Sequence, residues 1–253
     1  MAKYLITLFT ALFIGIFNQL PAHATWAFVQ GQTQAGSSAS SVAATFGSSV
    51  TAGHLVVVNL VWYSSPTVVN SVTDSASNTY SLAISNTSTA ASAATYYTVA
   101  TTGGAFTVTV NFSLGAYASI TINEYSFTPG TISVSNTNSV ANTTNSTPAS
   151  GNVTFTATKA LIIGTIQNAT QGETITPSTG FTLRNQVLYV GGTNEGVYAL
   201  DYLNATSSPQ NPGGTLGTSA QWTALGASFQ SSGDMAVTNY GGVFSGSPLL
   251  PQQ

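Results

Sequence analysis

Phe106-Thr107-Val108-Thr109-Val110-Asn111-Phe112 alternates apolar and polar side chains at every step. A period of two places the apolar residues on one face of an extended strand and the hydroxyl and amide residues on the other. Ala118, Ile120 and Ile122 repeat this alternation further along the chain. The region therefore predicts strands with one buried face and one polar face.

Two other segments are apolar on both faces. Residues 55–62 are interrupted only by Asn59, and residues 160–166 have the same character. Such runs are typical of central strands that are covered on both sides. We therefore expect both segments to lie in the middle of the fold.

Shorter β-rich runs, separated by Gly, Asn, Ser and Pro, predict the remaining strands. They fall at residues 26–33, 42–46, 68–73, 79–84, 95–100, 181–190, 197–203 and 222–229. No window after the N-terminal segment carries a sustained helical stripe. The predicted fold class is all-β, a single-domain antiparallel β-sandwich that is jelly-roll-like.

The N-terminus has the pattern of an export signal. Lys3 precedes an apolar run over residues 5–17, and Ala22-His23-Ala24 forms a small-x-small cleavage site. The run is short for a membrane span, which needs about 20 residues. We expect residues 1–24 to be a signal peptide and the secreted chain to begin at Thr25, without membrane insertion; an uncleaved anchor is the alternative.

The rest of the chain divides into a body and a tail. Residues 25–230 are expected to form the β-sandwich domain. Within it, residues 133–152 are almost wholly Ser, Thr and Asn, which favours a long edge strand or a mobile loop. The Gly- and Pro-containing tail, residues 231–253, is either a frayed terminus or a segment that pairs with a neighbouring subunit.

Charged residues are scarce. Only nine of the 253 residues are Asp, Glu, Lys or Arg, and none is Cys. Without the signal, two basic residues stand against six acidic ones, a formal charge of −4. Nucleic-acid binding and adhesion to anionic lipid need several cations, so both are excluded as functions. Thiol chemistry is excluded as well, and no cofactor or metal is expected.

Three runs carry a family resemblance. They are Ala52-Gly53-His54-Leu55-Val56-Val57-Val58 followed by Trp62, then Ser71-Val72-Thr73-Asp74-Ser75-Ala76-Ser77-Asn78-Thr79-Tyr80, and Ile122-Asn123-Glu124-Tyr125-Ser126. The sequence resembles an uncharacterised β-sandwich domain of secreted, often multidomain, bacterial proteins, over about residues 26–230. The resemblance implies a jelly-roll-like sandwich in an extracellular setting and no particular activity. Ser77 stands where that group commonly has Gly.

Asp74 and Asn78 flank a predicted hairpin turn. Asx side chains accept hydrogen bonds from nearby backbone amides, which favours a turn-stabilising role. The alternative is a calcium site built from Asp74, Asn78 and carbonyl oxygens. A calcium ion needs six to eight oxygen ligands, and this site has only one carboxylate. We therefore expect the turn-stabilising role.

Glu124 lies in the middle of a predicted strand. A buried carboxylate needs a partner, and Arg184 is one of only two cations after the signal. We expect a structural Glu124–Arg184 pair, or an Arg184 pair that uses Asp201 instead. The catalytic alternative is an acid pair for glycoside hydrolysis, drawn from Glu124, Glu195 and Asp201.

His54 is the single histidine after the signal, at the start of a predicted strand. We expect it to cap that edge, because no nucleophile elbow accompanies it and one histidine is a poor zinc site. Aromatic residues are core candidates. A ring platform for sugars is the alternative, and its candidates are Trp62, Tyr96, Tyr97, Tyr198 and Tyr202.

These features favour a secreted, noncatalytic structural or adhesive subunit that assembles by β-strand addition into a surface layer or filament. Its expected partners are further copies of the chain, or a cell-surface or matrix component. The first alternative is a carbohydrate-binding module with a glycan partner. The second is a glycoside hydrolase or related extracellular enzyme.

Overall fold

A computed structural model describes residues 25–63, 66–87, 91–128, 130–190, 192 and 195–234. The predicted signal peptide and most of the tail lie outside the described residues. In the part that is described, no helix is long and apolar enough to cross a membrane. The elements are β1 (Ala27–Thr45), β2 (Leu55–Tyr63), β3 (Val69–Asp74), β4 (Ser81–Asn86), β5 (Ser92–Val99), β6 (Thr107–Ser126), β7 (Ile132–Asn145), β8 (Ala160–Asn168), β9 (Ile175–Pro177), β10 (Thr182–Val187), β11 (Gly196–Ala205), β12 (Gly214–Leu216), β13 (Ala220–Ser231) and the 3-10 helix η1 (Ser232–Asp234).

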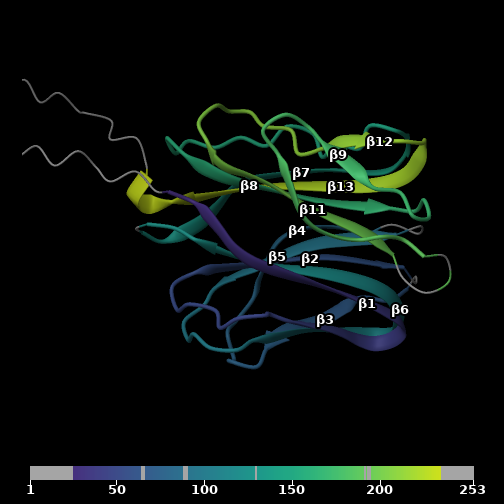
Figure 1. Cartoon of the computed structure of the whole chain (residues 1–253), viewed down its shortest axis with the longest axis horizontal. Coiled ribbons are helices and arrows are strands. Elements are labelled where there is room, and N and C mark those ends of the chain that lie inside the picture. The colour runs from purple at the N-terminus through teal and green to yellow at the C-terminus, as the bar shows by residue number, and fades with distance from the viewer. Residues whose placement is uncertain are drawn as a thin grey trace, which may run out of the picture.

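Two antiparallel sheets pack face to face, which confirms the predicted β-sandwich (Figure 1). The first sheet has the order β1-β6-β2-β5-β4, with β3 also paired to β6. The second has the order β10-β11-β8-β13-β7, and β9 and β12 form a small ribbon over it. The chain divides by sequence, because the strands of the first sheet all precede those of the second.

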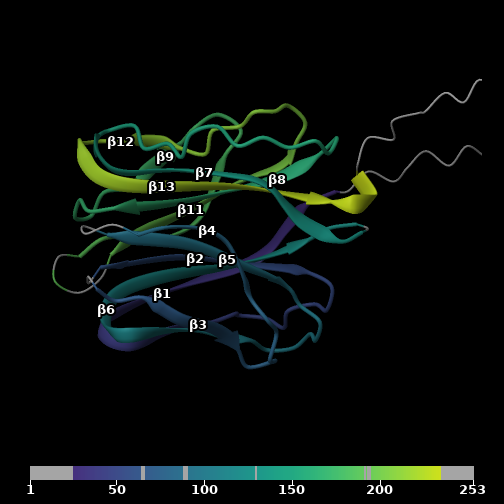
Figure 2. The ribbon, with the colours of Figure 1, turned by 180° about the vertical axis from the view of Figure 1, so that it is seen from behind.

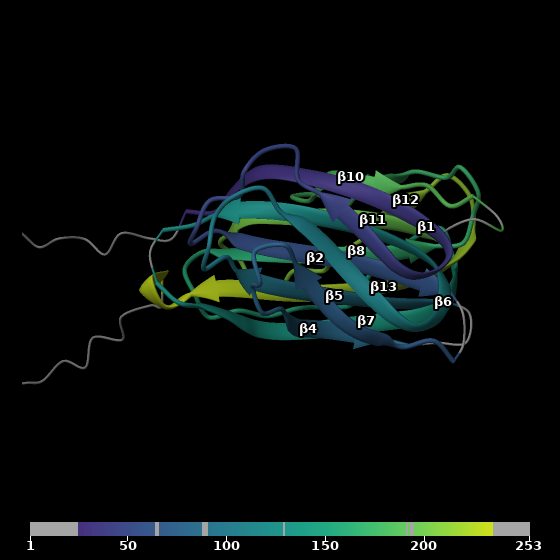
Figure 3. The same cartoon turned by 90° about the horizontal axis from the view of Figure 1, so that it is seen from below.

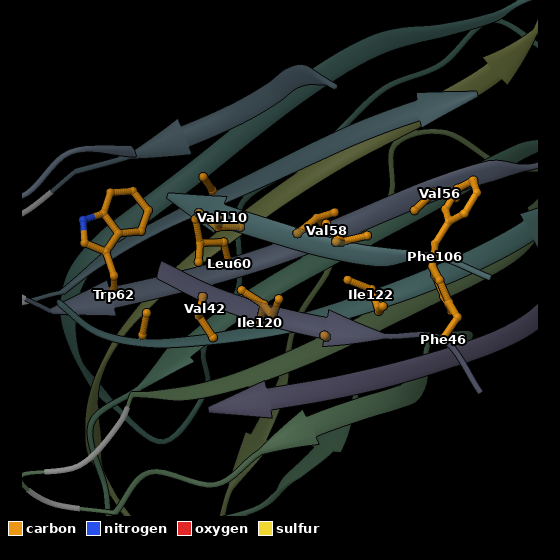
Figure 4. Packing of buried hydrophobic residues seen from close by; sticks show 14 of the residues in the cluster. Val42, Phe46, Val56, Val58, Leu60, Trp62, Phe106, Val110, Ile120 and Ile122 are labelled. Carbon is orange, nitrogen blue, oxygen red and sulfur yellow. The ribbon is translucent and has the colours of Figure 1, made fainter. Parts of the chain in front are cut away.

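The two segments that are apolar on both faces are central strands, as predicted. In β2, Val56, Val58 and Leu60 pack into one core cluster, while Leu55 and Val57 pack with residues of β8 in another (Figure 4). All nine residues of β8 are buried as well. Its outer face lies under β9, β12 and the loops beside them, so neither sheet exposes its central strands.

The first sheet bends back on itself. Residues 26–33 and 42–46, predicted as separate strands, belong to the single strand β1, which bends where Gly36 and Ala39 interrupt its register with β6. The second half of β1 and the first half of β6 form a lower layer with β3 (Figure 2). Val108 and Val110 point into the core from this layer, whereas Thr107 and Thr109 are partly exposed. The predicted alternation is therefore confirmed.

A buried polar row links the sheets between their apolar clusters. Asn59 of β2 donates to Thr165 Oγ1 of β8 at 2.5 Å, and Thr165 shares a 2.7 Å hydrogen bond with Thr95 of β5. Asn59 Oδ1 accepts from Thr121 at 3.2 Å and from Asn123 at 3.3 Å. A shift of one sheet over the other would leave these buried groups unpaired, so the row favours a single alignment.

Gly31 leaves room for the end of this row, where Asn185 donates to Asn123. A Cβ at position 31 would overlap Asn185 and lie 2.5 Å from Asn123 Oδ1. We expect Gly31→Ala to lower the free energy of unfolding by about 1–3 kcal/mol, as overpacking does. Gly36→Ala on the same strand is the control, because its Cβ would make an ordinary 3.4 Å contact with Val42. Equal midpoints for the two variants in urea unfolding would contradict this account.

Candidate functional site

Glu124 is fully buried beneath the loop that precedes β2. It accepts hydrogen bonds from Gln30 Nε2 at 2.7 Å, from the Thr51 backbone at 2.9 Å and from His54 Nδ1 at 2.6 Å. The expected Glu124–Arg184 pair is wrong, because His54 fills that place. His54 stands immediately before β2 and ties its start to β6 through this bond. The side chain of His54 remains 22% exposed.

Arg184 of β10 instead pairs with Asp201 of β11, the second partner considered. The Arg184 Nε to Asp201 Oδ2 distance is 2.7 Å, and the aspartate is fully buried. Burial raises the pKa of Asp201 above its ordinary value, and Arg184 opposes that rise. Burial also raises the pKa of Tyr125 well above its usual range, and the neighbouring Asp201 adds to the effect. The tyrosine therefore stays neutral.

Glu195 is buried near the opposite end of the sandwich. Its carboxylate accepts a 3.1 Å hydrogen bond from Gln167 Nε2. Burial raises the pKa of Glu195 to about 7, and the Gln167 bond opposes the rise. Proton uptake at this site is therefore expected near neutral pH.

These acids do not form the pair that glycoside hydrolysis requires. Glu195 and Asp201 are six residues apart along one chain segment, which corresponds to about 20 Å in an extended strand, against roughly 5–10 Å for a catalytic pair. Glu124 lies on the face of β6 that carries Ile120 and Ile122, away from the second sheet. Across the described residues, no three of His, Asp and Glu converge as a metal site.

Asp74 organises the turn between β3 and β4, but the predicted hairpin is wrong, because β3 pairs with β6 and β4 pairs with β5. Its Oδ1 accepts from the backbone of Ala76 at 2.9 Å and of Asn78 at 3.0 Å. Its Oδ2 accepts from Asn78 Nδ2 at 2.8 Å and from the Tyr80 hydroxyl at 3.0 Å. Both carboxylate oxygens are thus taken by protein donors. This geometry favours the turn-stabilising role over calcium.

Ser77 adopts a left-handed backbone in this turn, with φ of 61°. Only glycine enters that region without a steric cost. Ser77→Gly should raise the free energy of unfolding by about 0.5–1 kcal/mol. The melting temperature would then rise by about 1–4 °C. Ser85→Gly in β4 is the control and should lower it, since glycine weakens a strand.

The five candidate sugar-binding aromatics do not form a platform. Trp62 is 3% exposed and donates from Nε1 to the Thr67 carbonyl, and Tyr198 is fully buried. Tyr96 and Tyr97 are consecutive strand residues that pack into different core clusters. Tyr202 packs edge-on against Phe181. Among the described residues, Tyr63 is an exposed aromatic, 47% exposed, and it is the cross-strand partner of Tyr117.

One flank of the sandwich is closed, because β1 lies against β10 and the end of β11. Asn204 accepts from the Trp26 N–H at 2.8 Å and donates to its carbonyl at 2.9 Å. Arg184 lies over the Phe28 ring, with its Cζ 4.7 Å from the centroid. On this side, β1 and β10 therefore cover each other's edges.

The other flank is formed by the edge strands β4 and β7, opposite β1 and β10 (Figure 3). Asn86 of β4 donates to Ser139 of β7 at 3.1 Å. In the Ser-, Thr- and Asn-rich stretch 133–152, for which a strand and a loop were both considered, residues 133–145 belong to the edge strand β7 and residues 146–152 lie outside any strand. Among the described strands, β7 pairs with β13 alone, and it contains no charged residue and no proline. Charges and prolines are the usual protection of a sheet edge.

The edge of β7 is regular only in its centre. Its pairing with β13 is interrupted by bulges between Val134 and Asn136 and between Val140 and Thr143. Both the N–H and the carbonyl of Asn136 bond to Ser228 Oγ, so Asn136 faces β13. By alternation the backbone of Thr137 and Ser139 points away from the sheet. The Ser139 N–H is held by Asn138 Oδ1 at 2.8 Å. Residues 136–140 therefore form a short, uncharged acceptor edge whose outward groups are the Thr137 N–H and the carbonyls of Thr137 and Ser139.

Sequence reasoning missed the partners of Glu124 and the location of the open edge. Gln30 and Thr51 have no side-chain chemistry that marks them as ligands of a carboxylate 94 and 73 residues away. The composition of residues 133–152 did point to an edge. Its position beside β4 depends on the stacking of the sheets.

The geometry defines a class, a charge-poor antiparallel β-sandwich with one closed and one open flank. No protein-family model matches the sequence, and no curated protein or solved structure is significantly similar to it. The resemblance to a secreted bacterial β-sandwich domain stays a prediction.

Proposed function

We propose that the chain is a secreted, noncatalytic structural or adhesive subunit of an extracellular layer or filament. The observation that carries this proposal is the open flank, where a long edge strand without charge or proline lies beside a second edge strand. Natural monomers usually protect such edges. An edge of this kind recruits another strand through main-chain hydrogen bonds.

The fate of the ionisable groups supports the same function. Glu124, Asp74 and Asp201 each bind neighbouring protein groups that fix a loop, a turn or a sheet flank. Charged residues make up only 4% of the sequence, so copies can pack with little repulsion between like charges.

Electron microscopy and sedimentation of the purified secreted protein test the proposal. We expect assemblies that grow with protein concentration and change little with ionic strength, because few charges are available to be screened. Monodisperse monomers at all concentrations, in solution and on bacterial surfaces, would contradict it.

Carbohydrate binding is a second candidate because of one observation. Tyr63 is exposed beside its cross-strand partner Tyr117, and paired rings of this kind suit sugar faces. Binding on a glycan array that is lost in Tyr63→Ala would favour this candidate.

A further inference from the structure

We propose that residues 136–140 of β7 accept, as an added antiparallel strand, the C-terminal segment 235–253 of a second copy of this chain. The inference rests on the proposed function and deepens it, because it names the acceptor and the donor of assembly. The donor segment begins Met235-Ala236-Val237-Thr238-Asn239-Tyr240, which has no charge and no proline.

The two parts match in length. The bulges of β7 leave a regular run of about five residues between them, and residues 235–240 form a run of six residues before Gly241 and Gly242. Nineteen residues follow Asp234 and can extend for about 60 Å. The tail is therefore long enough to leave its own sandwich and lie along a neighbour.

The direction of the chain favours a second copy over the same molecule. Ser232 donates to the Thr131 carbonyl at 2.9 Å, and the Thr131 N–H donates to Ser232 Oγ at 3.0 Å. The tail therefore leaves beside the start of β7, at the end of the sandwich where β1 also begins (Figure 1). A tail that folded onto its own β7 from there would run parallel to it.

Every strand pairing between the described elements is antiparallel. A parallel addition would be the exception and slightly less stable per residue. A tail from a neighbouring copy can approach β7 from its far end and pair antiparallel. Each subunit then offers one edge and one tail, so head-to-tail contacts extend into a filament when the rotation between copies does not close.

Two proline variants of the full secreted chain test this. Thr137→Pro removes an outward-pointing N–H of the acceptor edge, where proline is tolerated in a strand. Val237→Pro removes a donor N–H of the tail. Thr137→Val and Val237→Thr are the controls, because they keep both N–H groups.

In sedimentation velocity we expect each proline variant alone to remain a monomer. An equimolar mixture should form particles with the mass of two chains, since one variant keeps a working tail and the other a working edge. The two controls should assemble as the unmodified chain does. At a dilution where all the proteins are monomeric, equal melting temperatures of the proline variants and the unmodified chain will show that the sandwich is intact.

The failures are distinguishable. If the unmodified chain assembles and the proline variants assemble equally well, this pairing is wrong while the proposed function stands. If the equimolar mixture of the two proline variants stays monomeric, this pairing is likewise wrong while the proposed function stands. If the unmodified chain never assembles, the proposed function fails with it. At a dilution where the unmodified chain is also monomeric, a lower melting temperature of Val237→Pro would show that the tail pairs with its own body, which also overturns the inference.

Discussion

Replacing Arg184 by Met is expected to lower the free energy of unfolding by about 3–5 kcal/mol at neutral pH. The substitution keeps much of the apolar stem but leaves the fully buried Asp201 without its cation. Asp201 Oδ1 already has no hydrogen-bond partner in the described residues, so the arginine is the main compensation for that charge. Urea unfolding followed by tryptophan fluorescence measures the loss.

Two further measurements separate this cause from lost packing. Arg184→Met combined with Asp201→Asn should recover much of the stability, because the buried charge is removed with its partner. The penalty of the single variant should also shrink in acid, as the carboxyl group becomes protonated. An equal loss in the single and double variants at all pH values would assign the effect to packing over Phe28 instead.

Glu195→Gln is expected to raise the free energy of unfolding by about 3 kcal/mol above neutral pH. The folded chain holds the pKa of Glu195 at about 7, against an ordinary value of 4.5. Between these values the unfolded chain releases its proton while the folded chain keeps it, so stability falls as the pH rises. Below pH 4.5 both states are protonated and the difference disappears, whereas above about pH 7 it is complete.

Unfolding free energies measured across this pH range, from acid to mildly alkaline, test the prediction. The unmodified chain should lose stability relative to Glu195→Gln as the pH rises, with the two equal in acid. Glu195→Asp is the matched control, because it retains a carboxyl group and should retain the pH dependence. Parallel curves for the unmodified chain and Glu195→Gln would show that burial does not raise this pKa.

Much of the local structure follows from the sequence. The alternation of residues 106–112 and the apolar runs at 55–62 and 160–166 predict strands with the correct number of buried faces. These properties are local, because side-chain direction in a strand depends only on position along it. The same holds for the Asp74 turn, whose partners lie within six residues.

The candidate site was harder to predict, because its contacts join distant segments. Alternation places a carboxylate on one face of a strand but does not say which strand will cover that face. Glu124 meets His54 because β2 pairs with β6, and Arg184 meets Asp201 because β10 pairs with β11. Composition alone allowed several pairings between the acids and the few cations, and the expected Glu124–Arg184 pair was wrong.

The sequence by itself determined that this chain is an all-β sandwich of strands whose polarity comes from hydroxyl and amide groups, because strand period and composition act residue by residue. The tertiary structure decided which acids have which partners, that the five candidate aromatics form no platform, and that β4 and β7 leave one flank open. The reason is that a free edge exists only relative to neighbouring strands. Every residue except proline has the same backbone N–H and C=O groups, so the sequence does not show which of them are paired. Only the order of strands in the sheet shows which remain without a partner.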